Sequence, residues 1–90
     1  MAFSEADLYR AKSYMHAEEE TDETITEFLE MSEEYLRETG IVKNDSNKAR
    51  YRIALFAVAL HYYDNRDAGN EVPAIPGNTQ RLINQLKPYP

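Results

Sequence analysis

The residues of this chain with the clearest chemical potential are glutamates spaced three and four positions apart. Glu27, Glu30 and Glu34 form one such set, and Glu19 and Glu23 form another. On a helix this spacing places carboxylates on one face. Carboxylate oxygens are ligands that Mg²⁺ accepts in proteins. A magnesium site is therefore one hypothesis for this chain.

Catalysis with such a metal would also need a second acidic pair. Helical nucleotide pyrophosphohydrolases carry that pair on the next helix, where Asp64 and Asp67 are the candidates here. The same glutamate spacing is typical of any solvated glutamate-rich helix, and acids that hold a metal must face inward. The inward positions of this helix are expected to be mainly apolar: Ile25, Phe28, Leu29, Tyr35 and Leu36. We therefore favour a solvated outer face, formed by Glu23, Glu27, Glu30, Glu34 and Glu38.

The histidines, glycines and absent cysteines of this chain predict no catalytic, metal or phosphate-binding site. His16 and His61 lie in different segments, and neither follows a glutamate at i−3 as a di-iron bundle requires. The chain has no cysteine, which excludes thiolate metal sites and disulfides and fits a reducing cytoplasm. Its three glycines form no phosphate-binding pattern. We expect no catalytic residue, no metal and no cofactor.

Charge is unevenly distributed along the chain. Residues 1–38 carry twelve acidic and three basic residues, a net charge of −9, whereas residues 39–90 carry seven basic and four acidic residues, a net charge of +3. The total of −6 is unsuited to binding duplex DNA by counterion release. Opposite charges in two halves favour head-to-tail contact between copies, an arrangement that closes into rings. The alternative is an acidic face that only keeps the protein soluble.

Hydrophobic periodicity predicts one all-α domain over residues 1–90 with four helices. A short first helix is expected over about 5–15, with Ser4 as its N-cap and Asp7 three residues later. A long second helix over about 21–39 begins at Thr21 and stops at Gly40.

A long third helix is predicted over about 47–66 and a short fourth helix near the C-terminus. Ser46 or Asn47 caps the third, and Asn78 or Thr79 caps the fourth, which Pro88 ends. Residues 71–77, which contain two prolines and a glycine, are not expected to be helical. No apolar stretch reaches the roughly 18 residues that a membrane span requires.

The third predicted helix is apolar on almost every side between Ile53 and Leu60. Either other helices surround it or part of its surface meets another subunit. At its end, Tyr63 and Arg66 are candidates for intersubunit contacts, because tyrosine and arginine are enriched at interfaces. The alternative is ordinary capping of the helix by Arg66.

Several segments together carry a resemblance to a known family. These are the acidic stretch Glu18 to Glu23, the helix end Tyr35 to Ile41, the helix end His61-Tyr62-Tyr63-Asp64-Asn65-Arg66, and Ile75-Pro76-Gly77 before Leu82-Ile83. In this order they resemble the head–tail connector (DNA-packaging adaptor) family of long-tailed phages and prophages. The likeness covers nearly the whole chain. Its most specific parts are the end of the third helix and the Ile75-Pro76 stretch before the last helix.

The resemblance implies a non-enzymatic virion structural protein at the head–tail junction, made in the cytoplasm of a bacterial host. Such a protein forms a dodecameric ring of identical subunits under the portal protein, extends the DNA channel, and docks the next head-completion or tail protein. DNA passes through the lumen without sequence-specific binding, and no membrane is involved. The alternatives are the Mg²⁺-dependent pyrophosphohydrolase and a small acidic regulator or DNA mimic.

Two groups of residues become candidates for contacts. Charge asymmetry and the resemblance together nominate a subunit interface: Tyr63, Asn65, Arg66, Arg50, Arg52, Glu27, Glu30 and Glu34. The C-terminal segment is nominated for contact with the portal or a neighbouring subunit, through Ile75, Pro76, Leu82, Lys87 and Tyr89.

Overall fold

The computed structural model describes residues 3–41, 43, 48–67 and 74–87, and the regular structure in these residues is helical. It contains four helices: α1 (Glu5–Met15), α2 (Asp22–Glu38), α3 (Lys48–Asp64) and α4 (Gly77–Leu86). The predicted all-α, four-helix class, with a long second and third helix, is confirmed. None of the described helices is long and apolar enough to cross a membrane.

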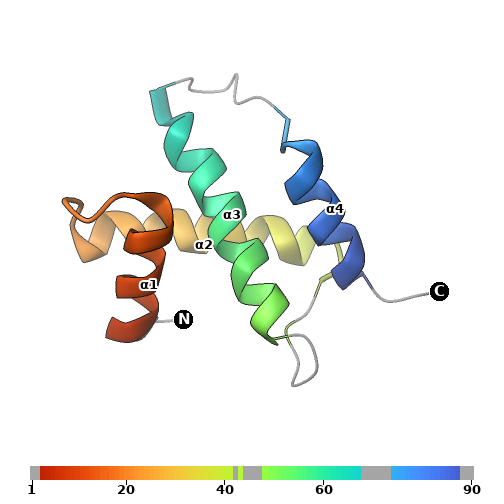
Figure 1. Ribbon diagram of the computed structural model, residues 1–90, viewed down its shortest axis with the longest axis horizontal. Helices are drawn as coiled ribbons and strands as arrows, with labels where there is room; N and C mark the ends of the chain where they lie inside the picture. The colour runs from red at the N-terminus through yellow and green to blue at the C-terminus, as the bar shows by residue number, and fades with distance from the viewer. Residues whose placement is uncertain (1–2, 42, 44–47, 68–73, 88–90) are drawn as a thin grey trace.

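Helix α3 is the centre of the fold. It packs against α1, α2 and α4, while α1 also contacts α2. In Figure 1, α3 crosses in front of α2, with α1 on one side of it and α4 on the other. The molecule is thin in this viewing direction, with extents of 41 × 31 × 20 Å. The acidic helix α2 therefore forms the back layer, and α1, α3 and α4 form the front layer.

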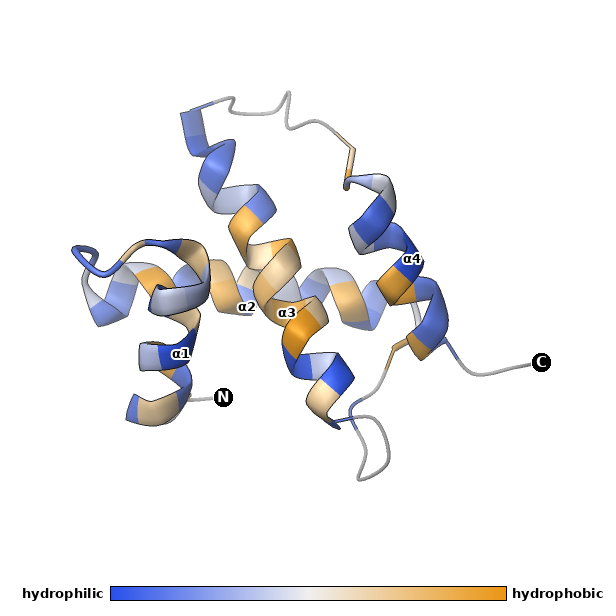
Figure 2. Ribbon diagram, in the orientation of Figure 1, coloured by the Kyte–Doolittle hydropathy of each residue, from blue (hydrophilic) through white to orange (hydrophobic). Residues whose placement is uncertain are grey.

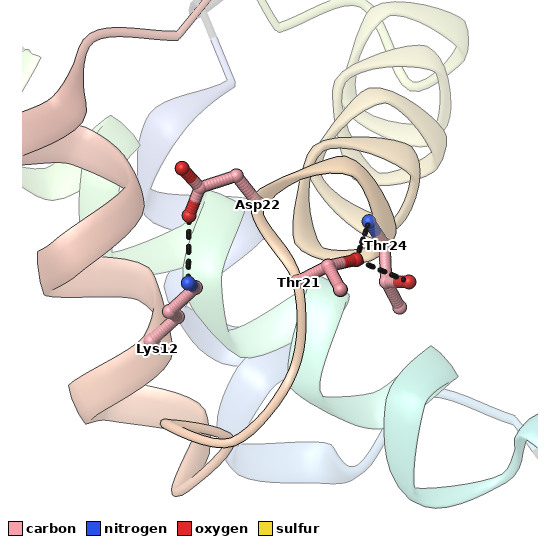
Figure 3. Close-up of polar contacts among 4 residues, drawn as sticks. All are labelled: Lys12, Thr21, Asp22 and Thr24. Atoms are coloured by element: carbon pink, nitrogen blue, oxygen red, sulfur yellow. Dashed lines mark hydrogen bonds and ion pairs between the residues drawn. The ribbon is translucent and has the colours of Figure 1, made fainter.

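The first two helices begin at side-chain N-caps, as predicted. The Ser4 hydroxyl accepts a hydrogen bond from the Asp7 amide (3.1 Å), and the Asp7 carboxylate accepts one from the Ser4 amide (3.3 Å), which completes a capping box. At α2, Thr21 Oγ1 accepts from the Thr24 amide at 3.1 Å (Figure 3). The Lys12 ammonium lies 2.6 Å from the Asp22 carboxylate and ties α1 to the first turn of α2 (Figure 3).

Gly40 ends α2 as predicted. Its φ of 89° lies in the left-handed region, where a side chain would be strained. The Gly40 amide donates to the Arg37 carbonyl, and the Ile41 amide donates to the Leu36 carbonyl, both at 3.0 Å. These two bonds form a Schellman motif, which turns the chain and places Ile41 in the core.

The core lies between the two layers. Helix α2 contributes Ile25, Leu29, Ser32 and Leu36, and α3 contributes Ala54, Leu55, Phe56, Val58, Ala59 and His61. Figure 2 shows the apolar residues of α3 concentrated in its middle, where the other helices surround it. The apolar third helix is thus covered mainly within the chain. Buried Ser32 belongs to this core because its hydroxyl donates to the Leu55 carbonyl at 2.7 Å, across the α2–α3 contact.

The predicted end of the third helix differs from the structure. Helix α3 ends at Asp64, two residues early, because the Asn65 side-chain amide donates to the His61 carbonyl (2.8 Å) and helps close the helix end. Its predicted caps, Ser46 and Asn47, lie outside the described residues, as does Pro88.

The predicted cap of the fourth helix was wrong, as was the prediction that Gly77 is not helical. Helix α4 begins at Gly77, with Pro76 as the N-cap in an extended conformation. The Pro76 carbonyl accepts from the Gln80 amide at 2.8 Å, and Asn78 accepts only from the amide of its neighbour Thr79. The fixed φ of Pro76 suits the residue just before a helix, but proline has no side-chain acceptor, so α4 begins without a side-chain cap.

Candidate assembly surface

The glutamates of α2 form an exposed row on the side away from the core. We call Glu23, Glu27, Glu30, Glu34 and Glu38 the acidic row. Like charges at this spacing repel one another mildly along the helix. Among the described residues, no three histidine, aspartate or glutamate side chains lie close enough to hold a metal ion. The structure therefore places Glu27, Glu30 and Glu34 toward solvent and does not bring them together with Asp64 as a metal site.

A shallow cavity of about 140 Å³ opens within the acidic row. We call it the acidic hollow; it is lined by Met31, Glu34, Tyr35, Glu38 and Tyr62. Burial raises the pKa of the Tyr62 phenol above its ordinary value, and neighbouring Tyr35, Glu38 and Glu34 raise it further. Both acids disfavour another negative charge at this place. The hollow thus combines an apolar floor with a negative rim, and it suits an apolar side chain accompanied by a cation.

Met31 is an exposed apolar residue of the acidic hollow and was not singled out from the sequence. Its side chain is 46% exposed, which is unusual for a large apolar residue on a helix with a well-formed core face. The signal was present in the spacing, since Met31 follows Glu27 by four residues and precedes Glu34 by three. Helical periodicity places it with the glutamates and not with the core.

The first turns of α3 present the opposite charge. Lys48, Arg50 and Arg52, which we call the basic end, are exposed and lie at the N-terminus of the helix. The helix macrodipole is positive there and disfavours cations. Lys48 and Arg52 share a cavity with Asp7 and Glu33 of the same chain, whereas Arg50 does not line that cavity. Ile53 lies three residues after Arg50, on the same side of the helix, and is 48% exposed. An acidic neighbour would stabilise this end of α3.

A second cavity of about 180 Å³ lies where α1, α2 and α3 meet beside the basic end. Its polar lining carries both signs of charge: Asp7 and Glu33 face Lys43, Lys48 and Arg52. Tyr51 also lines it, and burial together with the charge of Glu33 raises the pKa of this phenol. The two acids offset most of the charge of the three cations, so the cavity gives no strong indication of a charged ligand.

The predicted interface residues at the end of α3 make contacts within the chain. The Tyr63 hydroxyl donates to Glu20 Oε2 at 2.8 Å, and its ring meets Phe28 edge to face with 5.5 Å between centroids. The Arg66 guanidinium lies 4.2 Å from the centre of the Tyr63 ring and donates to the Tyr63 carbonyl at 2.6 Å. Together these contacts fasten the end of α3 to the start of α2. A role between subunits stays a prediction for Tyr63, Asn65 and Arg66.

The residues nominated for portal contact are distributed along α4 and its approach. Ile75 and Leu82 are half-buried against the core. Pro76 and Lys87 are exposed at the two ends of α4. Tyr89 lies outside the described residues. The exposed ends of α4 leave surface for a partner, whereas Ile75 and Leu82 are occupied mainly with the fold.

Comparison of the chain with models of protein families, with curated proteins and with solved structures found no match.

We expect the stability of the protein to fall when the pH rises above about 10. The pKa of Tyr63 is raised chiefly by its hydrogen bond to Glu20, and burial raises the pKa values of Tyr51 and Tyr62, from an ordinary value of 10.0. A phenol with a raised pKa in the folded state stabilises the protein fully below its unfolded pKa. That contribution is lost as the pH passes through the folded value.

Thermal unfolding followed by circular dichroism between pH 8 and pH 11 measures this effect. The variant Tyr63→Phe keeps the ring contacts and removes the hydroxyl, so its melting temperature should be lower at pH 8 and should fall less steeply above pH 10. A melting temperature that rises through this range would contradict the expectation.

Proposed function

We propose that this protein is a head–tail connector of a long-tailed phage or prophage. It is a non-enzymatic virion structural protein that forms a ring under the portal, extends the DNA channel and docks the next head-completion or tail protein. The proposal rests on the motif order that resembles this family. The observation that carries it furthest is the pair of exposed, oppositely charged surfaces, the acidic row and the basic end, on one small all-α domain.

The placement of these surfaces supports ring formation. The acidic row lies on α2 in the back layer, and the basic end lies on α3 in the front layer (Figure 1). When two complementary patches of one chain lie on different sides, each copy can offer one patch to the copy before it and the other to the copy after it. Such heterologous contacts close into rings when the rotation per copy is right. A portal that presents repeated sites would select that rotation and add avidity.

Passage of DNA also agrees with the charge of the chain. The net charge is −6, so most of the surface of a ring would repel the phosphate backbone. A channel that has to let DNA pass must not bind it tightly. The negative charge supports a conduit and not a DNA-binding protein.

The proposal is tested by mixing the purified protein with the portal protein of the same phage. Light scattering should show one species of defined mass, and negative-stain images should show an added ring of twelve subunits below the portal. The protein without portal is the control for self-assembly. A protein that stays monomeric with the portal at every concentration would overturn the proposal, as would Mg²⁺-dependent turnover of nucleoside triphosphates or a stable complex with a DNA-binding protein in place of a ring.

A further inference from the structure

Two exposed apolar side chains lie within surfaces of opposite charge. Among the described residues, the large apolar side chains most exposed to solvent are Tyr9, Tyr14, Met31 and Ile53. The two tyrosines belong to α1, and each has a polar hydroxyl. Met31 and Ile53 have no polar atom that gains from hydration. One lies in the acidic hollow, and the other adjoins the basic end. This pairing of apolar centres with complementary charges is what a protein interface requires.

Neither side chain belongs to the buried core. Met31 lies two residues from fully buried Leu29, and Ile53 lies two residues from buried Leu55. Two residues correspond to about 200° around a helix, so each exposed side chain faces nearly opposite to its buried neighbour. Leu55 lies on the side of α3 that receives the Ser32 hydroxyl of α2. Met31 lines the acidic hollow with Tyr62 of α3. Tyr62 follows Ile53 by nine residues, which is about 180° around the helix, so Ile53 and the hollow lie on different sides of α3.

We propose that Ile53 of one copy docks into the acidic hollow of the next copy, against Met31, with Arg50 beside the rim carboxylates Glu34 and Glu38. This contact rests on the proposed ring, because it specifies which surfaces its subunits use. The occupant is a second copy of this chain. Both complementary halves are present once in every copy, and each half carries the charge that the other lacks.

The chemistry of the hollow supports this occupant over others. Its opening of about 140 Å³ and its floor of Met31, Tyr35 and Tyr62 suit a branched aliphatic side chain. Its rim requires a cation, and Arg50 is placed one helical turn from Ile53. Docking would also bring negative charge to the N-terminus of α3, where the helix dipole favours it. In such a contact the charges set orientation and encounter rate, and the buried apolar pair supplies most of the affinity.

Disulfide trapping tests the contact directly, because the natural chain contains no cysteine. The variants Met31→Cys and Ile53→Cys are prepared separately, mixed in equal amounts and oxidised mildly, with and without portal. Mass spectrometry then identifies the linked peptides. A docked pair has an effective concentration in the millimolar range, so we expect on the order of tenfold more 31–53 disulfide than random collision produces. The doubly substituted chain should give a ladder of covalent multimers.

The matched control is Tyr9→Cys mixed with Met31→Cys. Tyr9 is 73% exposed and thus more accessible than Ile53, so collision alone would favour the control pair. Equal yields from the two mixtures, or linkage of Met31→Cys mainly to itself, would overturn the proposed contact. Rings on the portal without the 31–53 link would overturn the contact and leave the connector function standing. The 31–53 ladder without any portal binding would support the contact and count against that function.

Discussion

Replacing Arg50 and Arg52 together with glutamate will prevent ring formation and leave the helices intact. The substitutions replace the positive charge of the basic end with negative charge, so its contact with the acidic row of the next copy becomes repulsive. Like charges across an interface cost several kcal/mol. About 3 kcal/mol already lowers an association constant by roughly a hundredfold. Light scattering and negative-stain images in the presence of portal measure the loss.

The fold should survive this change because of where the two residues lie. Both are exposed in the first turns of α3, where acids are favoured by the helix dipole and cations are not. The helical circular-dichroism signal should therefore be retained. The melting temperature should change little, because the gain from the helix dipole is opposed by the loss of the Arg52 charge beside Asp7 and Glu33. A loss of rings can then be attributed to the surface and not to unfolding.

A control with the same change in net charge distinguishes the effect of altering the basic end from the effect of altering the total charge of the protein. Arg10 on α1 and Arg81 on α4 are exposed and lie outside the basic end, and replacing both with glutamate should leave assembly nearly intact. Mixing the Arg50→Glu, Arg52→Glu variant with a Glu34→Lys, Glu38→Lys variant should restore contacts between the two proteins. Normal rings from the first variant alone would show that charge complementarity does not hold the ring together.

Replacing Leu29 with alanine will remove a large part of the stability of the isolated domain. Leu29 is fully buried between the layers, and a leucine-to-alanine change at such a site costs about 2 to 5 kcal/mol through lost burial and the cavity left behind. A domain of this size has about 5 to 15 kcal/mol of total stability. Urea unfolding followed by circular dichroism should show a lower midpoint and a loss of unfolding free energy of that size.

Met31→Ala is the matched control on the same helix. The side chain has a similar number of carbon atoms but is 46% exposed, so its removal should cost no more than about 1 kcal/mol. Equal destabilisation by the two substitutions would mean that α2 does not present its Leu29 side to the core.

The helix starts and stops that were predicted correctly depend on interactions within a few residues. The capping box of Ser4 and Asp7 and the turn at Gly40 join atoms no more than five residues apart. Such interactions are available to a short stretch of chain before any tertiary structure forms, so residue types and spacing were enough to predict them. The start of α4 was misplaced because the extended backbone of Pro76 replaced the side-chain cap that was sought.

The two faces of α2 were predictable for a related reason. Its apolar and acidic residues separate at a period of 3.6, so the core face and the acidic row could be assigned without knowing the neighbouring helices. Even Ser32 fitted the inward spacing, although its partner, the Leu55 carbonyl, lies 23 residues away and became evident only in the structure.

By itself the sequence determined the helical class, the faces of α2 and the separation of charge, because each follows from residue order along one element. Only the tertiary structure decided which part of α3 stays exposed, since a helix that is apolar on nearly every side has no periodicity to distinguish Ile53 from Leu55. It also decided that Tyr63 contacts Glu20, 43 residues away, and that Met31 lines a hollow with Tyr62. These pairings depend on how α3 crosses α2, which the packing of the whole core determines.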